Sequence, residues 1–173
     1  ESGLRIECPQ NVILGSNSFF GVDCKIYASE FSHIKIGSNA TFNSNVMINA
    51  RGKGKIVIGD NVLIGPNAVL RSNNHAFKNI NKPIKEQGMT EGDIYIEDDV
   101  WISANSVILP NCRIGKGAII AAGAVVINNV NSWLLVPPNI RQFLLLQCSH
   151  LGGSHKRGDD QILLVLEQLE YLT

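Results

Sequence analysis

The stretch IEDDVWISANSVILPNCRIGKGAIIAAGAVV, residues 96–126, has an aliphatic residue at every sixth position. These residues are Ile96, Ile102, Ile108, Ile114, Ile120 and Val126. The same spacing occurs earlier in the chain, in Leu14, Phe20 and Ile26, in Ile36, Phe42 and Ile48, and in Ile58, Ile64 and Leu70. An amphipathic helix needs a spacing of about 3.6 and a simple alternating strand a spacing of 2, so neither explains the pattern.

Each six-residue unit has a second regular position. Glycine often follows the aliphatic residue, and a small residue comes four places after it. The small residues are Ser18, Cys24, Ala40, Ala68, Ser106, Cys112, Ala118 and Ala124. Two inward positions in six residues are typical of a short strand followed by a turn, with three such units closing one triangular coil. The sequence therefore predicts an all-β solenoid, a parallel β-helix with one continuous core.

The lengths of the predicted coils reveal one long insertion. Leu14, Ile36, Ile58, Ile96 and Ile114 begin successive coils, which are therefore 22, 22, 38 and 18 residues long. A coil of three six-residue units needs 18, so two coils contain a short corner insertion and one contains a long one. Insertions of this kind leave a solenoid as loops on one face and often form its binding surface. We expect a loop at residues 75–93, with His75 at its start.

Length and charge restrict the class of protein. The 173 residues fit one domain, which we divide into a β-helix at 10–130 and a tail at 131–173. Fifteen basic and fifteen acidic residues give no net charge, so we expect neither nucleic acid nor an anionic membrane as partner. The longest apolar runs, such as ILLVL at 162–166, are too short for a membrane span. We expect a soluble, cytoplasmic protein.

The four cysteines lie far apart, without a C-x-x-C pair or a matching pair of histidines. They are Cys8, Cys24, Cys112 and Cys148. We expect small buried side chains here, and neither a disulfide framework nor a metal site.

Together, the repeated aliphatic-Gly-x-x-small units, the NNHAF and EQG segments of the insertion, and the stretch YIEDDVWISANSVILPNCRIGKGAIIAAGAVV resemble the hexapeptide-repeat acyltransferases. Within that family they most resemble the sugar O-acetyltransferases of the maltose, galactoside and colanic acid-like polysaccharide group. The resemblance covers about residues 10–130. It implies a left-handed β-helix, a homotrimer, and acetyl transfer from acetyl-CoA to a carbohydrate hydroxyl, as in polysaccharide biosynthesis. A left hand follows from the resemblance alone, because crossovers between parallel strands are otherwise right-handed.

His75 is the candidate general base. An alcohol is a poor nucleophile until its proton is removed, and a neutral imidazole, with an ordinary pKa of about 6.5, removes it well near neutral pH. The N-H-x-F motif of the family places His75 at the catalytic position by resemblance. The family pattern around this histidine also implies that Asn74, Glu86 and Gln87 bind the acceptor.

The resemblance also implies a groove for the acyl donor. Trp101 matches the VW-I segment that lies along this groove in relatives, and Ala121, Ala122 and Gly123 are small enough for a pantetheine arm to pass. Main-chain N–H groups of Ser103 or Ala104 are the candidate donors to the oxyanion. Ser103 stands where most relatives have glycine.

The resemblance ends after Val126. Relatives continue with a VV-T-K-D-V-P stretch and an A-G-x-P-A-K segment, whereas this chain has Asn128 in place of the lysine and no such segment. Either the solenoid ends differently here, or the reading frame differs from the ancestral one after about Asn131. In the tail, Lys156 and Arg157 are candidates for the 3′-phosphate of CoA. A helix at 160–172 is expected to cover a coil end.

Two other functions stay open at this point, and a third is disfavoured by the number of histidines. An acetyltransferase acting on an antibiotic or an amino sugar would use the same scaffold and histidine. A non-catalytic β-helix scaffold would have lost the donor site together with the usual tail. A carbonic anhydrase on this fold needs three histidines around a metal, and the repeat region has only His33 and His75.

Overall fold

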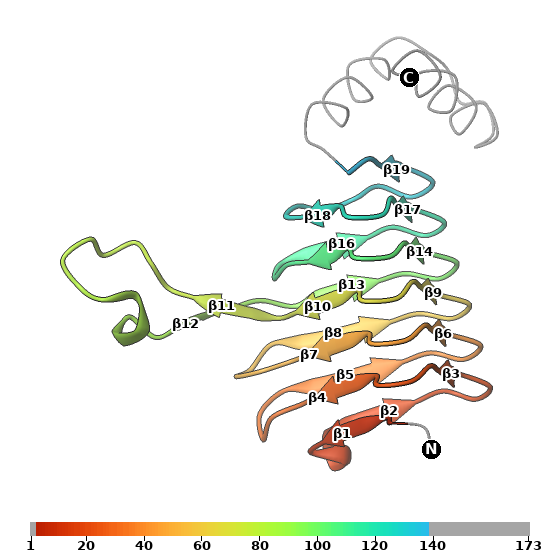
Figure 1. Ribbon diagram of the computed structural model, residues 1–173, viewed down its shortest axis with the longest axis horizontal. Coiled ribbons are helices and arrows are strands. Elements are labelled where there is room, and N and C mark those ends of the chain that lie inside the picture. The colour runs from red at the N-terminus through yellow and green to blue at the C-terminus, as the bar shows by residue number, and fades with distance from the viewer. Residues whose placement is uncertain (1–2, 139–173) are drawn as a thin grey trace, which may run out of the picture.

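The computed structural model describes residues 3–138, which form a triangular prism of short parallel strands with one arm projecting from it (Figure 1). We name its three sheets faces A, B and C. Face A consists of β1 (Arg5–Glu7), β4 (Lys25–Tyr27), β7 (Met47–Asn49), β10 (Val69–Arg71), β15 (Val107–Ile108) and β18 (Val125–Val126). Face B consists of β2 (Val12–Leu14), β5 (His33–Ile36), β8 (Lys55–Ile58), β13 (Ile94–Ile96) and β16 (Cys112–Ile114). Face C consists of β3 (Phe19–Phe20), β6 (Thr41–Phe42), β9 (Leu63–Ile64), β14 (Trp101–Ile102), β17 (Ile119–Ile120) and β19 (Leu135–Val136).

The strand register confirms the predicted coils. On face B, Leu14 pairs with Ile36, Ile36 with Ile58, and Ile96 with both Ile58 and Ile114. These are the residues that the period of six assigns to the start of each coil. The fold is a left-handed parallel β-helix, as the resemblance implies.

The core contains the aliphatic and small residues that the repeat selects. Ile36, Phe42, Ile64, Leu70 and Ile120 are all nearly inaccessible to solvent. The small residues beside them are buried too, from Cys24 in the lower coils to Ala124 near the top. At the lower end, Leu14 is 40% exposed because β2 is an edge strand with no coil beneath it.

The corner between faces C and A is built on an asparagine ladder. Asn45, Asn67 and Asn105 each adopt a left-handed backbone, with φ between 58° and 60°, which asparagine tolerates better than most residues. The Asn45 Nδ2 donates to Asn67 Oδ1 at 2.9 Å, and the Asn67 Nδ2 donates to Asn105 Oδ1 at 3.2 Å. Gly123 takes the equivalent place one coil higher, at φ +74°, and a Cβ there would meet only open space. The ladder therefore stops where the predicted donor groove begins.

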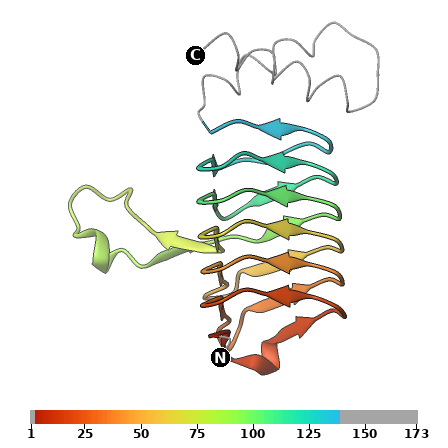
Figure 2. The same ribbon diagram turned by 45° about the vertical axis from the view of Figure 1, so that its right-hand side comes forward.

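All insertions leave the prism at one corner, between faces A and B. Two short ones connect β4 to β5 and β7 to β8, and the long one connects β10 to β13. The long insertion is a two-stranded hairpin, the arm, that projects away from the coils at mid-height (Figure 2). Its strands β11 (Asn73–His75) and β12 (Met89–Glu91) are antiparallel, and a short 3₁₀ helix, η2 (Ile84–Glu86), lies near its tip. A second 3₁₀ helix, η1 (Pro9–Asn11), connects β1 to β2.

The boundaries differ slightly from those expected from the sequence. The solenoid already begins at β1 and continues to β19, beyond residues 10–130 at both ends. The arm begins at Asn73, two residues before the expected loop, because Asn73 and Asn74 already pair with β12. The helix expected at 160–172 and Cys148 lie outside the described residues. Cys8, Cys24 and Cys112 are free thiols, and burial raises the pKa of Cys24 and Cys112. Between residues 3 and 138 no helix has the length and apolarity needed to cross a membrane.

Candidate active site

His75 is the last residue of the outgoing strand of the arm and is exposed to solvent. It lies opposite Met89, and Asn74 lies opposite Thr90, whose hydroxyl donates to the Asn74 carbonyl at 3.3 Å. Hairpin pairing fixes the backbone on both sides of the imidazole. The candidate base is thus mounted on a strand, and not on an irregular loop.

The three predicted acceptor residues all lie in the arm, with Asn74 just before His75 on β11 and Glu86 and Gln87 at the end of η2. The last hydrogen bond of the hairpin runs from Ala76 N–H to the Gly88 carbonyl at 3.1 Å, and Gln87 and Glu86 follow immediately beyond it. The Gln87 side chain is already committed, because its Nε2 donates to the carbonyls of Asn79 and Lys82 at 2.8 and 2.7 Å. Its Oε1 accepts from Asn79 N–H at 3.0 Å. Gln87 therefore shapes the tip of the arm, whereas the side chains of Asn74 and Glu86 form no such bonds with other residues between 3 and 138.

Three polar side chains at the root of the arm were missed by sequence reasoning. Asn49 and Arg71 are register partners on neighbouring strands of face A, and Asn73 follows two residues after Arg71. Asn49 Oδ1, Arg71 Nε and Asn73 Oδ1 are buried atoms, and none has a hydrogen-bond partner among the described residues. Buried polar atoms without partners are rare in folded proteins, and they point to a ligand or to water. Asn73 as a whole residue is only 6% exposed.

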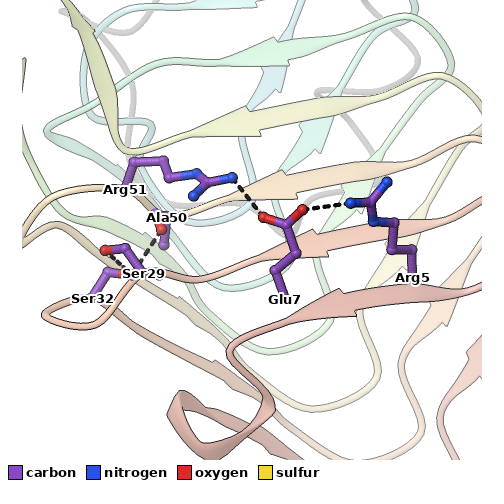
Figure 3. Close-up of polar contacts among 6 residues, drawn as sticks. All are labelled: Arg5, Glu7, Ser29, Ser32, Ala50 and Arg51. Atoms are coloured by element: carbon purple, nitrogen blue, oxygen red, sulfur yellow. Dashed lines mark hydrogen bonds and ion pairs between the residues drawn. The ribbon is translucent and has the colours of Figure 1, made fainter.

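Below this cluster, the outer surface of face A carries a charged group that is satisfied within the chain (Figure 3). The Glu7 carboxylate accepts from Arg5 at 2.9 Å and from Arg51 at 2.7 Å. Both guanidinium groups also lie within 6 Å of the centre of the Tyr27 ring. Because Tyr27 pairs with Asn49 in the sheet, this group stands directly beneath the unpartnered cluster. Within residues 3–138, Asn49, Arg71 and Asn73 are therefore the residues with buried side-chain polar atoms that lack a partner.

A carboxylate clamps the root of the arm to the coil below. Glu91, opposite Asn73 in the hairpin, accepts from the backbone N–H of Lys53 at 3.0 Å. Gly52 adopts φ +66°, and a Cβ at that position would clash with the Glu91 carboxylate. The buried hydroxyl of Ser72, the residue just before β11, accepts from Arg51 N–H at 3.1 Å. Both strands of the arm are therefore tied to the turn at residues 51–53.

The predicted donor residues come together at the corner between faces C and A. Ser103 and Ala104 follow β14, and Ala121, Ala122 and Gly123 follow β17 one coil higher. Gly123 N–H donates to the Ala104 carbonyl at 2.9 Å, which stacks the two turns directly. This corner is lined by small side chains over two coils, as the sequence suggests.

The two candidate oxyanion donors differ in this structure. The Ser103 N–H donates to the Ile120 carbonyl at 2.8 Å and belongs to the ladder between coils. The Ala104 N–H has no hydrogen-bond acceptor among residues 3–138, and its nitrogen lies over Gly65 in the turn of the coil below. Of these two N–H groups, only that of Ala104 is left without a partner by the described residues.

Trp101 lies on the outer surface of face C, just before this corner, and is 47% exposed. Its register partners Leu63 and Ile119 extend an apolar stripe above and below it. The outward direction agrees with its position in the six-residue unit. Its contact with an acyl donor stays a prediction.

Within one chain, the arm and the donor corner occupy the two opposite edges of face A. The arm leaves at the corner between faces A and B, whereas Ser103, Ala104 and Gly123 lie at the corner between C and A (Figure 1). Across the described residues, no three His, Cys, Asp or Glu side chains gather as metal ligands do.

Comparison with known proteins identifies the repeat. Residues 93–128 match the family model of the bacterial transferase hexapeptide (six repeats), and residues 11–50 and 55–70 match that of the hexapeptide repeat of succinyl-transferase. A 2,3,4,5-tetrahydropyridine-2,6-dicarboxylate N-acetyltransferase of Staphylococcus aureus is 56% identical over 43 residues. That match covers 25% of this chain and only 18% of the relative.

Solved structures share the fold over most of the described chain. An N-acyltransferase from Bacillus cereus, in complex with dTDP and 3-hydroxybutyryl-CoA, is similar with a TM-score of 0.64 and 18% identity, over 86% of this chain and 84% of that one. A hexapeptide-repeat acetyltransferase from Vibrio cholerae has a TM-score of 0.51 and 28% identity, over 74% and 70%. A maltose O-acetyltransferase from Clostridium difficile has a TM-score of 0.53 and 23% identity, over 76% and 57%.

The two family models together match more than half of the chain, and the strands of all three faces follow their six-residue unit. This chain therefore belongs to the bacterial hexapeptide-repeat transferase family.

Proposed function

We propose that this chain is an O-acetyltransferase that moves an acetyl group from acetyl-CoA to a hydroxyl of a sugar or surface polysaccharide. The observation that carries the proposal is the set of unpartnered polar atoms of Asn49, Arg71 and Asn73 at the root of the arm that bears His75. Family membership and the open donor corner support the acyl-transfer part. The acceptor part depends on this cluster.

A carbohydrate fits the cluster because each sugar hydroxyl both donates and accepts hydrogen bonds. Arg71 Nε offers a donor, and the Oδ1 atoms of Asn49 and Asn73 offer acceptors. Such mixed groups, close together, can bind two neighbouring hydroxyls at once. Leaving such atoms buried without partners costs about 1–3 kcal/mol each, so a side-chain movement that turns them toward a bound hydroxyl would recover part of that cost.

In the proposed reaction His75 takes the proton of the acceptor hydroxyl as its oxygen attacks the thioester carbonyl carbon. The main-chain N–H of Ala104 donates to the oxyanion that forms on the carbonyl oxygen. When the carbon–sulfur bond breaks, His75 returns its proton to the departing thiol sulfur. The imidazole thus begins and ends each cycle neutral.

Opposite edges of face A supply His75 and the donor corner, so we propose that one site uses two copies of the chain in a homotrimer. The arm of one copy would bring its histidine to the donor corner of the next. Phe77, Ile80 and Ile84 on the arm are 69%, 94% and 56% exposed, as expected of side chains that a neighbouring copy covers. Closed cyclic symmetry makes every such site equivalent.

N-acetylation of an amino sugar is the second candidate. Structural neighbours include the N-acyltransferase from Bacillus cereus, one structure of which holds dTDP-4-amino-4,6-dideoxyglucose and coenzyme A. The same histidine would then remove the proton from an attacking amine. A scaffold without activity is the third possibility, and it requires that acetyl-CoA does not bind.

The test is thiol release from acetyl-CoA against a panel of neutral sugars, amino sugars and polysaccharide fragments. Arg71→Met serves as the acceptor-site variant, and Lys35→Met, on the exposed surface of β5, as its control. We expect turnover with hydroxyl acceptors, and an acceptor KM about tenfold higher for Arg71→Met alone, the loss of one hydrogen bond to a charged group. Turnover with amines only would favour the second candidate. Neither turnover nor acetyl-CoA binding would favour the scaffold.

A further inference from the structure

An open pocket of about 420 Å³ lies on the face B side of the root of the arm. It is lined by residues of three successive coils: Gly92, Asp93 and Tyr95 from the start of β13, Asn111 and Arg113 from the start of β16, and Asn129 from the coil above. None of the residues proposed above for acetyl transfer lines it. Asn49 and Arg71 lie on face A, around the corner.

Hydrogen bonds hold most of the polar groups of the pocket in place. The Tyr95 hydroxyl donates to Asp93 Oδ2 at 3.0 Å, and Asp93 Oδ1 accepts from Lys55 N–H at 2.8 Å. Asn129 Oδ1 accepts from Arg113 N–H at 2.8 Å. The Asp93 carboxylate also raises the pKa of Tyr95, so the phenol stays protonated and keeps its donor on Asp93.

The pocket keeps both hydrogen-bond donors and hydrogen-bond acceptors that are not used within the described residues. The side-chain amide of Asn111 makes no hydrogen bond among the described residues, and the same holds for the Nδ2 of Asn129. Asp93 Oδ2 can accept a second hydrogen bond. Gly92 leaves room for the Asn111 amide, since a Cβ on Gly92 would clash with that side chain. Donors and acceptors therefore face one open space from three coils.

The charges around the pocket argue against an anionic ligand. Arg113 is the cation of the lining, and Glu97 accepts from its Nε and Nη2 at 2.8 and 2.7 Å. Asp93 adds a second carboxylate. A phosphate or a carboxylate would meet no uncompensated positive charge here, whereas neutral hydroxyl groups can use the carboxylate, the amides and the phenol.

We infer that this pocket is a second carbohydrate subsite, which binds a neutral sugar unit of a longer acceptor while another unit lies at His75. The inference rests on the proposed function, because it takes the acceptor to be a carbohydrate. Gly92 is three residues along the chain from Met89, the partner of His75, a separation of roughly 10 Å in extended backbone. One sugar ring cannot contact both places, so the pocket favours an oligosaccharide over a monosaccharide.

The test measures binding of neutral tetrasaccharides in the absence of acetyl-CoA, by calorimetry with maltotetraose, cellotetraose and galactotetraose, and with the corresponding monosaccharides. Tyr95→Phe keeps the ring and removes the hydroxyl. Asn111→Gly removes the amide without strain, since Asn111 has φ +65° and glycine adopts this region freely. Asn17→Gly, at φ +56° in the first coil and far from the pocket in sequence, is the matched control.

We expect at least one tetrasaccharide to bind, and each pocket variant to weaken its binding about threefold to tenfold, the range of one lost hydrogen bond. Monosaccharide binding and the Asn17→Gly control should not change. Binding of no tetrasaccharide, or binding that both pocket variants leave unchanged, overturns the inference. If monosaccharides are acetylated but no tetrasaccharide binds, the inferred subsite is wrong and the proposed function stands. If a tetrasaccharide binds but no acceptor is acetylated, the proposed function is wrong and the subsite stands.

Discussion

In the coil body, strands pair with strands of the coils above and below, and aliphatic side chains fill a common interior. In the arm, two strands pair only with each other, and the large apolar side chains Phe77, Ile80, Ile84 and Met89 are between 42% and 94% exposed. A lone two-stranded hairpin is marginal in water. The body thus carries the stability of the fold, and the arm carries the candidate base on a structure that is tied down only at its root. Substitutions in the body should therefore change the stability of the fold, and substitutions in the arm should change the activity.

The largest expected effect is on catalysis, from His75→Ala in the arm. Loss of a general base should lower kcat by a factor of about 10²–10⁴ while the melting temperature stays the same. The kcat is measured by turnover with the best acceptor of the panel, and the melting temperature by thermal unfolding. His33→Ala, an exposed histidine on β5, is the control and should keep full activity. Equal losses in both variants would contradict the assignment of the base to the arm.

The next effect is on stability, from Phe42→Ala in the body. Phe42 is fully buried and its ring stacks on Phe20, with the ring centres 4.6 Å apart. Its removal leaves a cavity between coils and should cost about 3–5 kcal/mol of unfolding free energy. Phe31→Ala, at an exposed ring between β4 and β5, is the matched change and should cost less than about 0.5 kcal/mol. Denaturant titration compares the two.

The connection between the two regions can be broken at Gly52→Ala. The new Cβ clashes with the Glu91 carboxylate, and the backbone at φ +66° disfavours alanine by about 1–2 kcal/mol. We expect faster hydrogen exchange at the amides of β11 and β12, unchanged protection in β8 and β13, and a reduced kcat. Gly88→Ala is the control: Gly88 has φ +80°, but an added Cβ there would meet open space, so this variant tests the cost of the left-handed backbone without a clash. Uniform loss of protection over the body would show that Gly52 supports the coils and not the arm.

The smallest effect concerns pH and the body alone. The backbone N–H of Lys116, and then the Arg113 guanidinium, lower the pKa of Glu97. A carboxylate with a lowered pKa in the folded state contributes stability above its ordinary pKa and loses it as the pH falls through the folded value. Glu97→Gln should therefore lower the unfolding free energy at pH 7 by less than about 1 kcal/mol and leave it unchanged near pH 2. Thermal unfolding at both pH values is the measurement, and a loss of equal size at pH 2 would exclude an ionic origin.

The period of six was sufficient to predict the coil body in detail. Ile58 and Ile96 are 38 residues apart, which is not a multiple of six, but each begins a run of three six-residue units, and they are register partners as that assignment predicts. The arm was predicted only as a loop. Its residues show no period, and the pairing of His75 with Met89 depends on where the hairpin turns, which the composition of the insertion does not specify.

The polar cluster escaped prediction for a different reason. Asn49 and Arg71 occupy outward positions of the repeat, where a polar residue ordinarily reads as solvated surface. In the structure, however, Asn49 Oδ1 and Arg71 Nε are buried, on two paired strands that each precede an insertion. The only signal in the sequence was their distance of a few residues from an insertion. The Ser103 backbone shows the reverse case, since its N–H, a candidate donor by resemblance, is used between coils.

The sequence by itself determined the β-helix, its inward residues and the coil that contains the insertion, because a strict period fixes which side chains face the interior wherever the chain winds. The tertiary structure alone decided that the insertions leave at one corner, that polar atoms of Asn49, Arg71 and Asn73 are buried near the root of the arm, and that the predicted donor corner lies at the other edge of face A. Those placements depend on how coils of 22 and 38 residues stack on one another, and contacts between coils are set by the three-dimensional path of the corners and not by the repeat.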